Sequence, residues 1–118
     1  MANPETIKNY IADGAVGQYL IVKPGTNPND VKVAAAGTDK VIGVSTFVAA
    51  DDNSPCDVIH DGIADVICGG NVAFGDLLTS DANGKAVVAV ATNRTIGTAL
   101  SAGAAGDIIP VLIDLGNF

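Results

Sequence analysis

The chain has 118 residues, which is enough for one domain with one hydrophobic core. Hydrophobic residues make up 48% of it but aromatic residues only 4%, so few side chains are available to stack on bases or sugars. Thirteen acidic residues against six scattered basic ones give a net charge of −7, which argues against a nucleic-acid partner and against an anionic membrane surface.

Residues 1–10 are polar and include Pro4, and they lack the basic and apolar regions of a signal peptide. No apolar run in the sequence approaches the length that spans a bilayer. We therefore interpret residues 1–10 as an extended N-terminal arm that becomes ordered when it lies on another surface. The alternative is that Tyr10 and Ile11 begin the first strand of the domain.

Residues 11–118 are predicted to form a single all-β domain, because short apolar stretches alternate with turn signals. The expected strands are 19–22, 31–36, 41–49, 58–60, 63–68, 77–79, 86–91, 96–100 and 108–113. Asp61-Gly62 is predicted to separate two of them, and Asn83-Gly84 is the strongest hairpin signal because both residues tolerate the positive φ of a type I′ turn. A short helix over 71–79 is the one helical alternative. The predicted fold class is a small antiparallel β-sandwich or barrel.

An internal repeat is the most informative pattern in the chain. Residues 29–44 align without a gap with residues 83–98, at an offset of 54. The identical pairs are Asn29/Asn83, Val33/Val87, Ala35/Ala89, Thr38/Thr92, Ile42/Ile96 and Gly43/Gly97. Residues 56–59 also resemble 106–109, at an offset of 50, which predicts four extra residues in the preceding loop of the first copy. The pattern indicates one β-unit used twice, with pseudo-repeat halves of about 17–67 and 75–113.

That preceding loop is polar and is a candidate contact with a neighbouring protein, the alternative being an ordinary solvated loop. Its residues are Asp51, Asp52, Asn53, Ser54 and Pro55.

No catalytic, cofactor-binding or metal-binding residues are predicted. His60 is the only histidine and lacks a nucleophile in a suitable context, so we interpret it as a structural residue at a strand end or in a loop. The stretch from Thr79 to Gly84 resembles the start of a calcium loop but lacks the required first and last acidic ligands. Cys56 and Cys68 are expected to be thiols, although they can form a bridge if the strands they flank are adjacent.

A set of motifs in a fixed order resembles a known family. They are Lys8-Asn9-Tyr10-Ile11 with Gly14, Gly75-Asp76, residues 81–85, residues 96–99 and residues 104–113. In this order they resemble the capsid cement proteins of tailed bacteriophages. The resemblance implies a non-enzymatic β-domain, made in the host cytoplasm, that docks on the outer surface of the assembled head. Its implied partners are the major capsid protein and two further copies of itself in a homotrimer.

The arm is the predicted element that contacts the capsid or another subunit, since an extended segment can add a strand to a neighbouring sheet edge. Its candidate residues are Asn3, Pro4, Ile7, Lys8, Asn9, Tyr10 and Ile11. The main alternative function is a carbohydrate- or host-surface-binding module displayed on the virion. That function calls for clustered exposed aromatic residues, which the composition disfavours.

Overall fold

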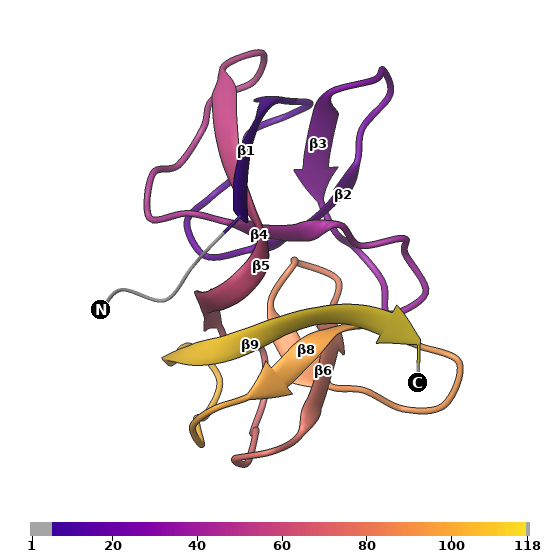
Figure 1. The fold of residues 1–118 in the computed structure, drawn as a ribbon, viewed down its shortest axis with the longest axis vertical. Coiled ribbons are helices and arrows are strands. Elements are labelled where there is room, and N and C mark those ends of the chain that lie inside the picture. Colours follow the sequence, from indigo (N-terminus) through magenta and orange to yellow (C-terminus); the bar gives the residue numbers. More distant parts are fainter. Residues whose placement is uncertain (1–5, 118) are drawn as a thin grey trace.

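The computed structural model describes residues 6–117 and shows them as β-strands joined by turns and loops (Figure 1). The strands are β1 (Thr6–Ala12), β2 (Ile21–Pro24), β3 (Asp30–Val33), β4 (Gly43–Ser45), β5 (Pro55–Ile67), β6 (Leu77–Ser80), β7 (Ala86–Val88), β8 (Arg94–Ala99) and β9 (Ile108–Asn117). The all-β prediction is confirmed. The helical alternative over 71–79 is wrong, because Val72 bridges to Gly103 and Leu77 begins β6. Residues 6–117 contain no helix long and apolar enough to cross a membrane.

The strands form two barrels that share β5. In the first barrel, the ring β1-β3-β2-β4-β5 is closed by pairing between β1 and β5. The second barrel has the order β5-β9-β8-β6-β7, and a bridge between Cys68 and Ala86 links β7 back to the end of β5. Figure 1 shows the first barrel above the second, with β5 passing from one to the other.

Strand β5 is continuous, although Asp61-Gly62 was expected to break it. Asp61 pairs with Thr6 in the first barrel and Gly62 pairs with Ile113 in the second. Gly62 has a φ of 93°, a conformation that glycine adopts without the steric cost of a Cβ atom. The turn signal therefore marks a bend at which one strand changes partners, and the two predicted strands are one.

The two barrels repeat the same pairings in the same register. Ile21 of β2 lies opposite Val44 of β4, as Leu77 of β6 lies opposite Thr98 of β8. The parallel pairing of β1 with β3 is matched by the parallel bridge that closes the second ring. The repeated stretches 29–44 and 83–98 thus form β3–β4 and β7–β8, so that one supersecondary unit is used twice. Register corrects the gapless alignment in β3 and β7 by one residue, because Val33 corresponds to Val88 and not to Val87.

Register corrects the expected loop length in the first copy. Val58 of β5 lies opposite Ser45, and Val111 of β9 lies opposite Ala99, so Val58 corresponds to Val111 and not to Ile108. The connection before β5 is consequently one residue longer than its counterpart before β9, not four. The sequence match at an offset of 50 paired residues of similar type. The equivalence of residues in the two strands is instead fixed by which side of each strand is buried.

The predicted hairpin at Asn83-Gly84 is present between β6 and β7, but its turn is wider than a type I′ turn. Ser80 pairs with Ala86, and of the two predicted residues only Gly84 has a positive φ. The Asp81 carboxylate accepts hydrogen bonds from the N–H groups of Asn83 and Lys85, at 2.8 and 3.0 Å. This side-chain cap stabilises the longer turn.

The strand predicted over 41–49 is the largest overestimate, since β4 ends at Ser45. The following residues leave the barrel, and Phe47 and Val48 are exposed by 66% and 57%. The apolar residues Phe47 and Val48 therefore lie on the surface and not in a strand.

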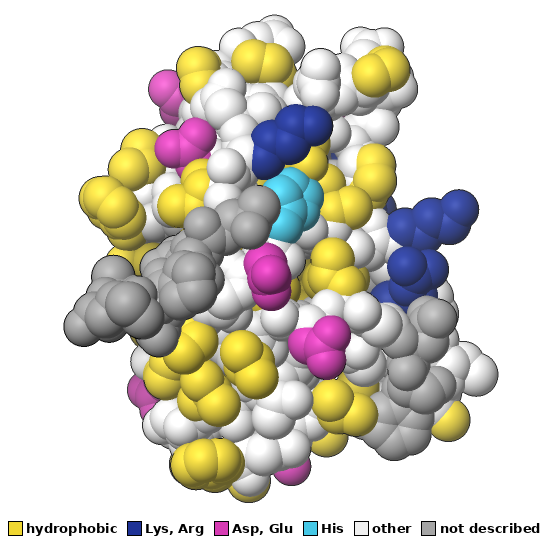
Figure 2. All heavy atoms as spheres, in the orientation of Figure 1, with side chains coloured by type: hydrophobic (Ala, Val, Ile, Leu, Met, Phe, Trp, Pro, Cys, Tyr) yellow, Lys and Arg dark blue, Asp and Glu magenta, His cyan; other side chains and the backbone are white. Residues whose placement is uncertain are grey.

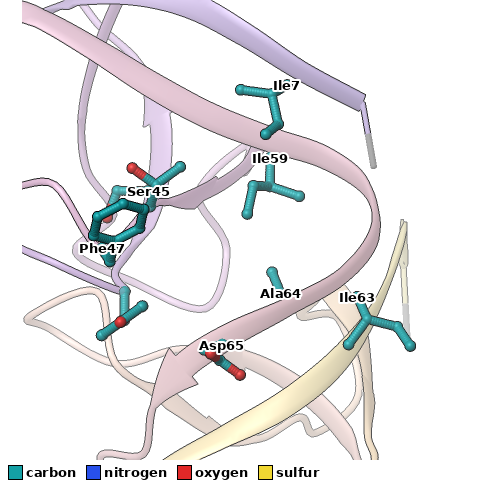
Figure 3. A pocket seen from close by; sticks show the side chains of 9 residues that line it. Ile7, Ser45, Phe47, Ile59, Ile63, Ala64 and Asp65 are labelled. Atoms are coloured by element: carbon teal, nitrogen blue, oxygen red, sulfur yellow. The ribbon is translucent and has the colours of Figure 1, made fainter. Parts of the chain in front are cut away.

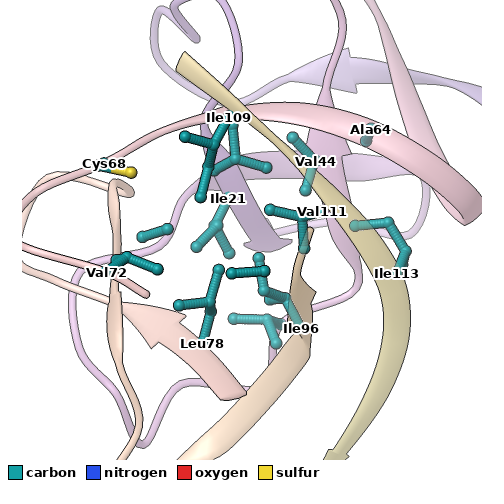
Figure 4. Close-up of a cluster of buried hydrophobic side chains, with 14 of the residues drawn as sticks. Ile21, Val44, Ala64, Cys68, Val72, Leu78, Ile96, Ile109, Val111 and Ile113 are labelled. Carbon is teal, nitrogen blue, oxygen red and sulfur yellow. The ribbon is translucent and has the colours of Figure 1, made fainter. Parts of the chain in front are cut away.

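Two clusters of buried aliphatic side chains form the core. The smaller one fills the first barrel. The larger one fills the second barrel and also includes Ile21 and Val44, which project outward from the first barrel. Figure 4 shows Ile21 and Val44 among Leu78, Ile109 and Val111 of the second barrel. One face of the first barrel thus completes the core of the second, which makes the two barrels one packed body.

Candidate binding surface

The arm residues that the structure describes lie in β1. Ile7 to Ile11 pair with β5 from Ile59 to Pro55, and Ile11 also pairs with Asp30 of β3. This placement is the alternative in which Tyr10 and Ile11 belong to the first strand of the domain itself. Asn3 and Pro4 lie outside the described residues.

The side chains of β1 divide between the two faces of the strand. Ile7, Asn9 and Ile11 are exposed, and the Asn9 amide donates to the Asp57 carboxylate at 2.9 Å. Tyr10 packs against the core of the first barrel, and the Lys8 ammonium lies 5.1 Å from the centre of its ring. The exposed members of the strand remain available to a partner, while Tyr10 serves the fold.

Tyr10 and His60 form a hydrogen-bonded pair in the first barrel. The Tyr10 hydroxyl lies 2.7 Å from His60 Nε2, and His60 Nδ1 lies 2.7 Å from the Ile42 carbonyl oxygen. Because a carbonyl only accepts, Nδ1 carries a hydrogen, and in the tautomer with its single hydrogen on Nδ1 the Nε2 atom accepts from the tyrosine. Burial raises the pKa of Tyr10, which keeps its hydroxyl protonated. His60 therefore lies within β5 with both ring nitrogens engaged, as a structural residue.

The structure brings the candidate loop 51–55 against the arm. Pro55 pairs with Ile11, and the Ser54 carbonyl accepts the Ala12 N–H at 2.9 Å. The Asp52 carboxylate accepts the Gly14 N–H at 2.8 Å, and Asp51 and Asn53 are exposed. Two segments that the sequence predicted separately thus form one polar rim at the end of the first barrel.

A groove of about 370 Å³ lies where β5 bends between the barrels (Figure 3). Its lining residues are Ile7, Tyr19, Ser45, Thr46, Phe47, Ile59, Ile63, Ala64 and Asp65. Among the arm residues that the structure describes, Ile7 is the one that lines it, and Phe47 is its most exposed apolar member. Sequence reasoning missed the other residues, because the groove depends on the bend in β5.

The outward side of the second barrel is an apolar face, which we call the second-barrel face. Cross-strand pairing arranges it in rows. The rows are Ile63–Leu112–Thr98–Leu77, Asp65–Pro110 and Ile67–Ile108. Leu77, Leu112 and Ile108 are exposed by 42%, 44% and 53%. Figure 2 shows hydrophobic side chains gathered over the lower half of the molecule, where β9 lies. Ile63 belongs to both the groove and this face, which makes the two continuous.

Several carboxylates of the described residues serve as turn caps, and Asp39 is an example. The Asp39 carboxylate accepts the N–H groups of Ala35 and Ala36, at 2.8 and 3.0 Å, and pairs with Lys23 at 3.0 Å. The Ala35 N–H, followed by Lys23, holds the pKa of Asp39 below its usual range. Among residues 6–117, no group of three or more His, Cys, Asp and Glu side chains is placed to hold a metal ion.

Both cysteines are buried free thiols. Burial raises the pKa of Cys56 and of Cys68, and Asp57 and Asp107 add to the respective effects. A raised pKa suppresses the thiolate that would react or bind a metal. They act as small core residues, in agreement with the expectation of thiols.

Comparisons with known proteins identify the class. The family model described as "Phage cement protein" matches residues 11–114. The chain therefore belongs to the phage cement protein family, which is a family of structural proteins of the phage virion. The fold is similar to that of the N base of the head fibre protein gp8.5 of bacteriophage phi29, with a TM-score of 0.72, 18% sequence identity and coverage of 98% of each chain. Among curated proteins, none matches the sequence.

Proposed function

We propose that this protein binds the exterior of the assembled phage head through the major capsid protein and stabilises the shell, as a cement or decoration protein. The observation that carries the proposal is the family match over residues 11–114. The continuous apolar surface formed by the groove and the second-barrel face supports it, because contiguous exposed apolar patches mark sites of protein interaction.

Stabilisation follows from preferential binding to the assembled state. A binder at a hundredfold excess over its dissociation constant lowers the free energy of that state by about 2.7 kcal/mol per site. Repetition over many sites on a shell makes modest affinity sufficient. We further propose a homotrimer on the outer surface of the virion, since three linked copies can engage three equivalent surfaces with added avidity.

The proposal is tested by mixing purified protein with undecorated expanded shells and, separately, with unassembled capsid subunits. We expect the protein to sediment with the shells, to leave the free subunits unbound and to raise the temperature at which the shells break down. Equal binding to free subunits, or no binding to shells, overturns the proposal. Synthesis in the host cytoplasm predicts that the protein is recovered untruncated from lysates before release of particles.

The alternative of a carbohydrate- or host-surface-binding module gains no specific support. Phe47 and Phe74 are exposed, but they lie on loops of different barrels, so these two do not form the paired aromatic platform that stacks on a sugar. Binding of the isolated protein to a glycan array would restore that alternative.

A further inference from the structure

The two barrels expose equivalent rows of side chains very differently. In the first barrel, Ile21 and Val44 are fully buried and Ile59 is 7% exposed, because the second barrel covers them. Register places Leu77 and Leu112 of the second barrel at positions equivalent to Ile21 and Ile59. These two leucines are more than 40% exposed. The second barrel therefore presents outward the kind of face that the first barrel buries.

Equivalent positions inside the two barrels also differ in chemistry. Tyr10 lies opposite Cys56 of β5, as Val66 lies opposite Ile109 of β9, so the Tyr10–His60 pair occupies positions that are aliphatic in the second barrel. His60 lies two residues before Gly62, where β5 passes between the barrels, so this polar pair belongs to the first barrel and leaves the second-barrel face without a polar counterpart.

Charge and fit indicate what covers this face. The rows of this face contain the exposed Asp65 and no Lys or Arg. Asp114, two residues after Leu112 in β9, is also exposed. Two copies that met through this face would bring like charges together, which disfavours self-association. A partner surface with an apolar centre and a basic rim matches it in both respects.

The first barrel of a second copy also fits poorly. Within one chain, the Gly84 carbonyl of the β6–β7 turn accepts the Ile21 N–H at 2.8 Å. A Cβ atom at Gly84 would lie 3.0 Å from the Ile21 carbonyl oxygen, closer than ordinary van der Waals contact. In the corresponding β2–β3 turn, the residue with positive φ is Asn29, which has a Cβ. If a second copy placed its first barrel on the second-barrel face, Asn29 would take the place of Gly84, and its Cβ atom would lie too close to the backbone it meets. The contact between the barrels of one chain is therefore not repeated between copies.

We propose that the second-barrel face, centred on Leu77 and Leu112, is the surface that docks on the capsid shell, at a site with an apolar centre rimmed by Lys or Arg. This inference rests on the proposed function and assigns it to the second barrel, away from the polar rim formed by the arm and loop 51–55.

The test compares the wild-type protein with two matched double variants in sedimentation with undecorated expanded shells. Leu77→Ser with Leu112→Ser alters the face, and the control variant, Ile11→Ser with Val48→Ser, alters the first barrel outside the groove, with all four side chains exposed. We expect the face variant to lose about tenfold or more in affinity, since central apolar contacts dominate binding, and the control variant to bind like the wild type. Equal thermal unfolding of the three proteins confirms that the variants fold.

A charge reversal provides a second measurement that does not depend on apolar burial. Asp65→Lys should weaken shell binding several-fold at low salt, and the difference should shrink at high salt. Asp51→Lys, which changes net charge equally at the polar rim, should leave binding unchanged.

The outcomes separate the two proposals. If the wild type fails to bind shells, the proposed function fails and this inference fails with it. If the wild type binds and the face variants bind equally well, the inference alone is overturned. Dissociation of a wild-type oligomer by Leu77→Ser with Leu112→Ser, measured by sedimentation velocity, would show that a second copy covers the face, and this also overturns the inference.

Discussion

In the first barrel, the outward residues Ile21 and Val44 are buried under the second barrel, whereas their counterparts Leu77 and Thr98 face away from the rest of the chain. The strand pairings around them are the same. Duplication thus supplied two equal faces, and stacking one unit on the other used only one of them. A duplicated fold of this kind leaves one apolar face uncovered by the rest of the chain.

The largest expected effect is a difference in stability between substitutions at the equivalent positions Ile21 and Leu77. Ile21→Ala should lower the free energy of unfolding by about 2–5 kcal/mol, because it leaves a cavity between the barrels. Leu77→Ala, at the equivalent but exposed position, should change it by less than about 1 kcal/mol. Urea unfolding of both variants measures the difference. Similar losses for the two would mean that Leu77 is also covered within the chain.

The Tyr10–His60 hydrogen bond in the first barrel is tested by Tyr10→Phe. Removal of the hydroxyl takes away the donor to His60 Nε2 and should cost about 1 kcal/mol, the usual contribution of such a hydrogen bond. Tyr19→Phe, which removes a hydroxyl outside this pair, is the matched control. A Tyr10→Phe protein as stable as the control would show that the packing of the aromatic ring, and not the hydrogen bond, stabilises this part of the barrel.

The smallest effect concerns a turn cap that differs between the copies. The Asp39 carboxylate accepts the N–H groups of Ala35 and Ala36, and at the equivalent position the Asn93 side-chain oxygen accepts the Val90 N–H at 2.9 Å. Asp39→Asn should therefore keep the cap but lose the ion pair with Lys23, at a cost of about 0.5–1 kcal/mol at neutral pH.

The pH dependence of that difference has a defined sign. The pKa of Asp39 is lowered in the folded protein, so the wild type holds its advantage over Asp39→Asn above the unfolded pKa. The advantage is lost as the pH falls through the folded pKa. Unfolding measured from neutral to acidic pH should show the two curves converge, and a constant gap would contradict the role of the charge.

The all-β class and the duplication could be predicted because turn residues and strand-length apolar runs are local signals. The bend at Gly62 could not be predicted, because the same Asp-Gly pattern occurs where a chain reverses direction and where one strand bends and changes partners. The pairing of β1 with both β3 and β5 was left open as well, since it joins residues distant in the sequence.

The candidate site was predictable only in part. Ile7 and Ile11 were selected from the sequence, and the structure places them exposed on β1. Leu77 and Leu112 were missed because Ile21 and Leu77 look alike in sequence, and only tertiary packing decides which of them is covered. A signal was present in β9, where the unbroken apolar run from Ile108 to Ile113 is typical of a strand with partners on both faces.

Strand β5 forms a wall of both barrels, with Gly62 at the crossing. No single cleavage of the chain can therefore release two intact barrels, and neither can swing on a linker relative to the other. Tension applied to one end of the molecule would pass along an unbroken peptide backbone into the other. Under the proposed function, this rigid tie keeps the bound protein from bending at a hinge between its two barrels.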